Sequence, residues 1–236
     1  MLTGRFGGRL LSWAHSSREL SFTTGYATQA GLRRRIQEDA VAIVPNCGLW
    51  AVVDGMGGHG GGAMASRLVS RALLAVKPEG GIAGMTRAVL RCLRQSHEEL
   101  NNLDTETGRK PGAAFIVLLT AADHYTAIWA GDARLYQQRR GVFSQVTQDH
   151  LAQDGHSLLQ AIGGGGPLEP EIVHGLLRPG DRFLLCSDGI TKTLSGAVMA
   201  KLLAAGEAQG SADALIAAVL AAGAPDDATG IVVAVN

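Results

Sequence analysis

The chain has 236 residues, of which 46% are hydrophobic and 18% are charged, and its formal net charge is zero. This composition is typical of a globular chain with a sizeable core. It excludes a disordered chain, and it provides no broad basic field that would attract nucleic acid or an anionic membrane. Cysteine occurs at Cys47, Cys92 and Cys186, in neither CxxC spacing nor an even set, so we predict a reducing, cytoplasmic location.

Residues 1–21 contain short apolar pieces interrupted by arginine, unlike the continuous apolar core of a secretory signal. We predict a loosely ordered N-terminal leader at 1–21, followed by a single domain at 22–236. No apolar run reaches the ~18 residues that span a bilayer, so no membrane partner is expected.

Apolar and β-branched runs predict strands, and apolar residues at helical spacing predict helices. In chain order, the expected strands are 22–28, 39–44, 49–53, 113–120, 125–129, 135–138, 142–145, 172–177, 182–186 and 231–235. The expected helices are 63–76, 85–103, 196–205 and 212–222. No internal repeat or linker divides the chain, and antiparallel-type strands with helices in two blocks predict layered packing in one domain.

Carboxylates stand at the ends of several apolar runs. Asp54-Gly55 follows one run, Asp188-Gly189 follows another, and Asp226-Asp227 precedes the last. A further acidic pair, Glu38-Asp39, lies between the basic triplet Arg33-Arg34-Arg35 and the apolar run Val41-Ala42-Ile43-Val44. Carboxylates at buried strand ends need a positive partner. Hard divalent cations take oxygen ligands from distant chain segments, so the pattern predicts a metal-dependent hydrolase.

Each of these segments also has a simpler interpretation. The glycine-rich stretch from Asp54 to Gly62 could cradle a nucleotide phosphate or be only a tight turn, but it contains neither GxGxxG nor GxxxxGK[ST]. Asp188-Gly189 and Asp226-Asp227 could be solvated turns. Arg34 carries a planar fork that suits a phosphate, although the basic triplet could be a charged surface turn.

Together, the motifs resemble one family, the metal-dependent serine/threonine protein phosphatases of type 2C (PPM family), and its bacterial stand-alone members above all. The motifs occur in the family's order, from about Phe22 to Asn236. They are Arg34-x-x-Gln37-Glu38-Asp39, Asp54-Gly55-Met56-Gly57-Gly58-His59, Gly131-Asp132-Ala133-Arg134, Thr147-Gln148-Asp149-His150, Ser187-Asp188-Gly189 and Asp226-Asp227-Ala228-Thr229. The resemblance implies an α+β fold, a four-layer α-β-β-α sandwich with two central antiparallel sheets.

The resemblance also implies roles for individual residues. The implied metal ligands are Glu38, Asp39, Asp54, Gly55, Asp188 and Asp226. Asp54 would bridge two Mn²⁺ or Mg²⁺ ions, and Glu38 and Asp39 would hold metal-bound waters. Arg34 and Asp54 would be catalytic, with Arg34 on the phosphate oxygens. Cys186 would be a packing residue, because no covalent phosphoenzyme is needed.

The implied activity is hydrolysis of phosphoserine and phosphothreonine in proteins by a metal-bridging hydroxide. The implied partner is a phosphorylated protein, a bacterial Ser/Thr kinase or its target, and the enzyme would reverse that kinase. A phosphorylated anti-sigma-factor antagonist or a secretion-system component are further candidate targets. A catalytically silent binding module is the alternative, but such a module would have lost carboxylates that this chain keeps at Asp54, Asp188 and Asp226.

The chain departs from the family at several positions. Met56 stands where some eukaryotic members have a histidine, which leaves the general acid open between a metal-bound water and His59. Asp227 replaces an asparagine, and we expect it to tune Asp226. Arg109 and Lys110 occupy the region of an acid that helps bind a third metal, which argues against a third ion. A short connection after His150 predicts a shortened flap near 151–156.

Overall fold

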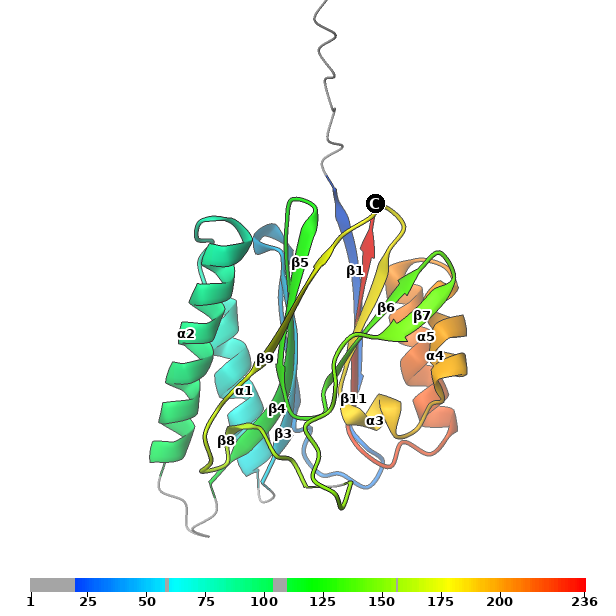
Figure 1. The fold of residues 1–236 in the computed structure, drawn as a ribbon. Helices are drawn as coiled ribbons and strands as arrows, with labels where there is room; N and C mark the ends of the chain where they lie inside the picture. The colour runs from blue at the N-terminus through cyan, green and yellow to red at the C-terminus, as the bar shows by residue number, and fades with distance from the viewer. Residues whose placement is uncertain (1–19, 58–59, 104–109, 156) are drawn as a thin grey trace, which may run out of the picture.

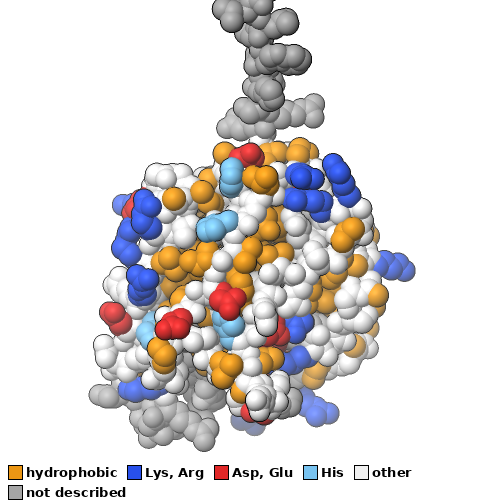
Figure 2. Space-filling model, in the orientation of Figure 1, with side chains coloured by type: hydrophobic (Ala, Val, Ile, Leu, Met, Phe, Trp, Pro, Cys, Tyr) orange, Lys and Arg blue, Asp and Glu red, His pale blue; other side chains and the backbone are white. Residues whose placement is uncertain are grey.

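The computed structural model describes residues 20–57, 60–103, 110–155 and 157–236. Two antiparallel sheets pack face to face, and helices cover both outer faces (Figure 1). This arrangement confirms the predicted four-layer α+β sandwich. No helix in the described ranges is long and apolar enough to cross a bilayer. In Figure 2, basic side chains gather at the upper right and along the left side of the face, and acidic side chains lie mainly in its lower half.

The first sheet has 5 strands in the order β1-β11-β10-β6-β7. Its strands are β1 (Phe22–Gln29), β6 (Arg134–Arg139), β7 (Val142–Gln145), β10 (Arg182–Cys186) and β11 (Ala228–Val235). Its outer face is covered by α4 (Gly196–Ala204) and α5 (Ala208–Ala221), and the short α3 (Asp188–Thr191) follows β10.

The second sheet has 6 strands, in the order β2-β3-β4-β5-β9 with β8 paired to β4. Its strands are β2 (Asp39–Val44), β3 (Leu49–Met56), β4 (Gly112–Ala121), β5 (His124–Ala130), β8 (Ile162–Gly163) and β9 (Glu171–Leu176). The 3-10 turn η1 (Pro45–Cys47) joins β2 to β3. Helices α1 (Gly61–Leu74) and α2 (Gly81–Asn102) cover the outer face.

Apolar side chains fill the spaces between all the layers. One cluster lies between the two sheets, a second lies under α1 and α2, and a third lies under α4 and α5. Strands β3 and β4 contribute to two clusters, because they are covered on both faces. This explains why their sequences are continuous apolar runs without polar alternation.

The structure differs from the sequence prediction in the shortest elements and at some boundaries. It adds β8 and α3, which were not predicted, and α5 begins at Ala208 instead of residue 212. Ser21 exchanges backbone hydrogen bonds with Asn236, at 3.3 and 2.9 Å, beside the start of β1. Residues 1–19 lie outside the described residues, so the N-terminal leader and the domain boundary at 22 stay predictions.

Candidate metal and phosphate site

The acidic residues predicted to bind metal lie at one end of the sandwich, the lower end in Figure 1. Asp39 begins β2 and is paired in register with Asp54 near the end of β3. From the other sheet, Asp188 follows β10 and Asp226 precedes β11. Both sheets therefore contribute carboxylates to the same end of the sandwich, opposite to the end where Ser21 and Asn236 lie.

Asp54 lies among the other carboxylates of this group. The backbone N–H of Asp188 donates to Asp54 Oδ2 at 3.4 Å. Burial raises the pKa of Asp54 well above its usual range, and the negative charges of Asp39, Asp188 and Asp132 raise this pKa further. An ionised Asp54 therefore requires positive charge close by.

Asp39 is buried and satisfied on one side only. Its Oδ2 accepts a hydrogen bond of 2.8 Å from Ser187 Oγ, and the same hydroxyl accepts from the Thr229 N–H at 2.9 Å. Its Oδ1 has no hydrogen-bond partner of ordinary geometry within the part of the chain described. Burial raises the pKa of Asp39 to about 7, and the nearby Thr229 and Ser187 hydroxyls limit the rise.

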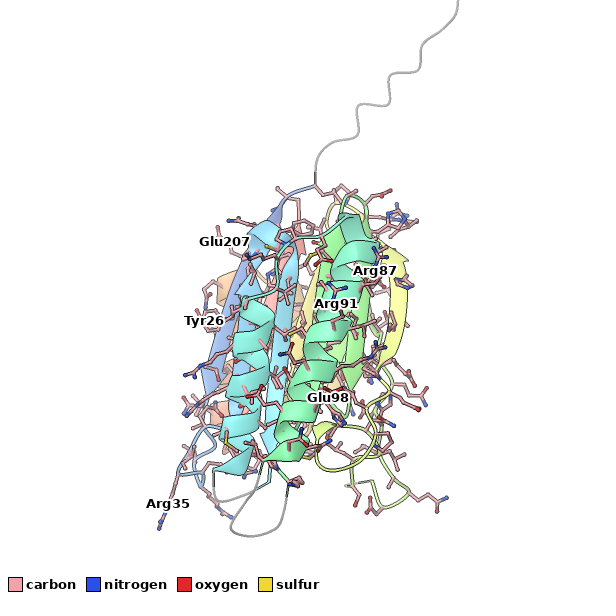
Figure 3. The ribbon with its side chains drawn as sticks, turned by 90° about the vertical axis from the view of Figure 1, so that its left-hand side faces the viewer. Tyr26, Arg35, Arg87, Arg91, Glu98 and Glu207 are labelled. Carbon is pink, nitrogen blue, oxygen red and sulfur yellow. The ribbon has the colours of Figure 1, made fainter. Side chains whose placement is uncertain are left out.

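Two side-chain cations contact the remaining carboxylates. Lys192 forms an ion pair with Asp188, one helical turn earlier in the chain. Arg34 Nη2 lies 2.5 Å from Asp226 Oδ1, and its Nη1 lies 3.7 Å from Glu38 Oε2. Arg34 is thus the member of the basic triplet that lies among the predicted ligands. Figure 3 shows Arg35 projecting away from the fold.

Gly55 is required by close backbone packing. A Cβ at this position would lie 2.2 Å from the Gly62 carbonyl oxygen and 2.5 Å from the Glu38 carbonyl oxygen. The Gly55 N–H donates to that Glu38 carbonyl at 3.1 Å. The end of β3 can therefore approach α1 and the start of β2 only with glycine here. The predicted role of the Gly55 carbonyl as a ligand stays a prediction.

The donor set fits divalent cations by its chemistry. Carboxylates and a backbone carbonyl are the ligands that Mg²⁺ and Mn²⁺ take. The unpartnered Asp39 oxygen and the mutual repulsion around Asp54 would both be relieved by a cation. No three His, Cys, Asp or Glu side chains of the described ranges already form a closed ligand group. Asp226 forms an ion pair with Arg34, and Asp188 forms one with Lys192.

Asp227 has a structural role in addition to the expected tuning of Asp226, which stays a prediction. Its Oδ1 accepts from the Gly31 N–H at 2.9 Å, and its Oδ2 accepts from the Glu38 N–H at 2.7 Å. The Asp227 residue is 5% exposed. It therefore ties the loop between β1 and β2, which carries Arg34, to the start of β11. The doublet Asp226-Asp227 was the only sequence signal for this contact.

Sequence reasoning did not assign Asp132 and Lys192 to the site. Burial raises the pKa of Asp132 to about 6, and the charge of Asp188 raises it next, so these two carboxylates are neighbours. Asp132 was visible as a motif residue, but only the fold brings it to Asp188. For Lys192, the signal was its i,i+4 spacing from Asp188.

The remaining predictions concern the general acid, the third metal, the shortened flap and Cys186. His59, Arg109 and residue 156 lie outside the described residues. Lys110 Nζ donates to the Leu103 carbonyl at 2.6 Å. In the segment expected to be a shortened flap, Leu151 forms a bridge with Leu158, and the chain turns back on itself. Cys186 is fully buried, and burial raises the pKa of its thiol far above the usual range, as expected of a packing residue.

Comparison with known proteins identifies the family. The family model described as Protein phosphatase 2C matches residues 33–221, which is more than half of the chain. The chain belongs to the protein phosphatase 2C family. It is 30% identical over 222 residues to the serine/threonine protein phosphatase PstP of Mycobacterium tuberculosis, an alignment that covers 86% of this chain. The chain spans 43% of the length of that relative.

Solved structures of this phosphatase family are similar over nearly the whole fold. PppA of Pseudomonas aeruginosa, described as a key regulatory component of T6SS, has a TM-score of 0.86 and 29% sequence identity. That alignment covers 92% of this chain and 98% of PppA. The catalytic domain of PstP in complex with 2 manganese ions has a TM-score of 0.77 and 29% identity, covering 92% of this chain and 99% of that domain. These similarities confirm the predicted fold.

Proposed function

We propose that this chain is a metal-dependent phosphatase that hydrolyses phosphoserine and phosphothreonine in proteins. Its family membership and the two manganese ions in the related PstP domain support this proposal. The main structural support is that Asp39 and Asp54 face each other on neighbouring strands, at one end of the sandwich. The backbone N–H of Asp188, from the other sheet, donates to Asp54. A catalytically inert binding module would have no need for this cluster of acids, of which Asp39 is buried.

Two Mn²⁺ or Mg²⁺ ions, when bound, would make a water acidic enough to attack phosphorus near neutral pH and would neutralise phosphate charge. Asp54, Asp188, Asp226 and the Gly55 carbonyl would hold the ions, and Glu38 and Asp39 would orient waters around them. Ser187 positions Asp39 through its hydroxyl. The proposed ligands come from both sheets, and the proposed mechanism needs no nucleophilic side chain.

Arg34 is the residue proposed to bind the phosphate. Its side chain is 43% exposed, so a ligand can reach the guanidinium. It contacts two predicted metal ligands, which places its fork at the margin of the acidic cluster. A phosphate could replace Asp226 as the partner of Arg34, and the fork can donate two parallel hydrogen bonds to phosphate oxygens. Arg34 would then orient the phosphate for attack and stabilise its developing charge.

Phosphate release from a phosphothreonine peptide tests this function. Wild-type protein should release phosphate with Mn²⁺ and stop when EDTA is in excess. Asp54→Asn should lower kcat at least about 100-fold, because one bridging charge is lost at the reacting centre. Asp123→Asn, on the exposed β4–β5 connection at the other end of the sandwich, is the matched control. A metal-independent wild type, or an active Asp54→Asn, would exclude the proposal.

The physiological substrate is proposed to be a bacterial Ser/Thr kinase or a protein that the kinase phosphorylates, so the enzyme would reverse the kinase in the cytoplasm. The similarity to PppA supports testing a phosphorylated secretion-system component early. The free cysteines Cys47, Cys92 and Cys186 are compatible with a reducing compartment.

A further inference from the structure

Helix α1 presents an unusual outward stripe. Its buried positions, including Ala65, Val69 and Leu73, pack on the second sheet. On the opposite side, Met64, Arg67, Arg71 and Leu74 follow helical spacing, and all are exposed. Met64 is 42% exposed and Leu74 is 49% exposed. The stripe therefore combines two apolar side chains with two cations, a mixture that suits a ligand with both acidic and apolar groups.

A groove of about 670 Å³ runs beside this stripe. It is lined by α1 residues between 63 and 72, by Glu99 of α2, and by Ile36 and Gly60 at one end. A second groove of about 450 Å³ shares Ala72 and Glu99 and continues between the two helices. Figure 3 looks onto this face, where α1 and α2 lie side by side.

Arg67 and Arg71 have no ion-pair partner among the residues that the structure describes, although both line the groove. By contrast, Arg91 on α2 is paired with Glu79 at 2.8 Å. Like charges four residues apart weaken a helix slightly. Arg71 lies in the last turn of α1, where a cation is favourable, but Arg67 has no such compensation. The position of Arg71 thus has an explanation within the helix, whereas that of Arg67 has none.

The groove ends at the candidate phosphate site. Ile36 lies two residues after Arg34 in the same loop, and its side chain is 47% exposed. Gly60 immediately precedes α1. A peptide whose phosphate is held at Arg34 can therefore continue past Ile36 and Gly60 and along α1.

We propose that the α1 groove docks an acidic segment of the phosphoprotein substrate, an inference that rests on the proposed phosphatase function. The ligand class follows from charge complementarity, because two cations, Arg67 and Arg71, line the groove against one acid, Glu99. The two guanidinium groups can donate hydrogen bonds to carboxylates, and an apolar side chain can pack on Met64 and Leu68. A helix rises ~1.5 Å per residue, so Arg67 and Arg71 lie roughly 10 and 16 Å beyond Gly60. An extended peptide covers ~3.3 Å per residue, which places the acidic residues about three and five positions beyond Gly60.

The test uses phosphothreonine peptides that differ only in these acidic positions, with p-nitrophenyl phosphate as a substrate too small to reach the groove. Arg67→Glu/Arg71→Glu should raise KM for the acidic peptide about fivefold to tenfold, because two attractions become repulsions. KM for the alanine-substituted peptide and for p-nitrophenyl phosphate should not change. Arg87→Glu/Arg94→Glu, on exposed positions of α2 outside both grooves, is the matched control; Figure 3 labels Arg87.

Binding is also measured without turnover, as fluorescence anisotropy of the labelled acidic peptide with full-length Asp54→Asn protein. Weaker binding with the groove variant but not with the control supports docking even if turnover fails. The proposal is overturned if both variants weaken binding equally, or if neither changes it. It is also overturned if the groove variant alters only the oligomeric state, since the groove would then be an interface between copies. Absence of metal-dependent turnover in the wild type would instead count against the proposed function.

Discussion

Lys192 is the residue whose contact has the clearest consequence for metal binding. Its ammonium forms an ion pair with Asp188. Burial lowers the pKa of Lys192, but the hydrogen bond to Asp188 and the negative charges of Asp188, Asp132 and Asp54 outweigh it and raise this pKa. It therefore places a fixed positive charge where the chain is predicted to bind a divalent cation. A cation that binds Asp188 must displace this ammonium or tolerate its repulsion.

We expect Lys192→Met to bind Mn²⁺ about threefold to tenfold more tightly than the wild type, because one competing charge is removed from a partly exposed site. Free Mn²⁺ measured by electron paramagnetic resonance during a titration gives the affinity independently of activity. Lys201→Met on the exposed side of α4 is the control. Weaker binding by Lys192→Met would show that Lys192 instead positions Asp188 for the metal.

At the scale of secondary structure elements, the connection between β11 and the β1–β2 loop decides where Arg34 lies. Asp227 accepts two backbone N–H groups from this loop, and both hydrogen bonds are buried. One carboxylate thus fixes both the approach to β2 and the segment that carries the candidate phosphate-binding residue.

Asp227→Ala should destabilise the fold by about 2–4 kcal/mol, because two buried N–H donors lose their acceptor. For a chain of this size the melting temperature should fall by roughly 5–15 °C. Asp227→Asn keeps one accepting oxygen, so its loss should be smaller. Thermal unfolding followed by circular dichroism measures both variants. An alanine variant with wild-type stability would mean that the loop is held by other contacts.

The longer elements could be predicted from sequence because their patterns are strong. Strands β3 and β4 are apolar along their length, and α2 shows helical spacing over most of its residues. By contrast, β8 and α3 are too short to produce a pattern. The first turn of α5 was missed because Ala208 is followed by Gly210 and Ser211, which weaken a helical signal.

The candidate site could likewise be predicted only where the sequence pattern is local. Carboxylates that end apolar strands are visible in sequence, so Asp54 and Asp188 could be proposed as ligands. The cross-strand register that sets Asp39 against Asp54, and the fold that brings Asp132 to Asp188, depend on tertiary pairing. The groove beside α1 also depends on how α2 and Ile36 lie next to the helix, which no local pattern contains.

At the scale of the whole molecule, the predicted ligands join the two sheets. Asp39 and Asp54 come from one sheet, whereas Asp188 and Asp226 flank strands of the other. A cation held by ligands from both sheets would bind the folded state and not the unfolded chain. Metal binding should therefore stabilise the entire sandwich.

We expect Mn²⁺ at 100 times its dissociation constant to stabilise the protein by about 2.7 kcal/mol per site. This corresponds to a rise in melting temperature of roughly 5–10 °C per site. Differential scanning calorimetry with Mn²⁺ and with EDTA measures the shift, and Asp54→Asn should show a much smaller one. Equal shifts in the wild type and Asp54→Asn would indicate that the ion binds elsewhere.

The pairing of β1 with β11 has a consequence for synthesis of the protein. Among the strands that the structure describes, β1 lies at the edge of its sheet and pairs with β11, which follows it by about 200 residues of sequence. On the ribosome, β1 must therefore wait until residues 228–235 have emerged before its backbone groups find their partner. The sheet formed by β2 to β5 and β9 can assemble earlier. The nascent chain thus completes its sandwich, and the acidic end to which Asp226 belongs, only after β11 has emerged.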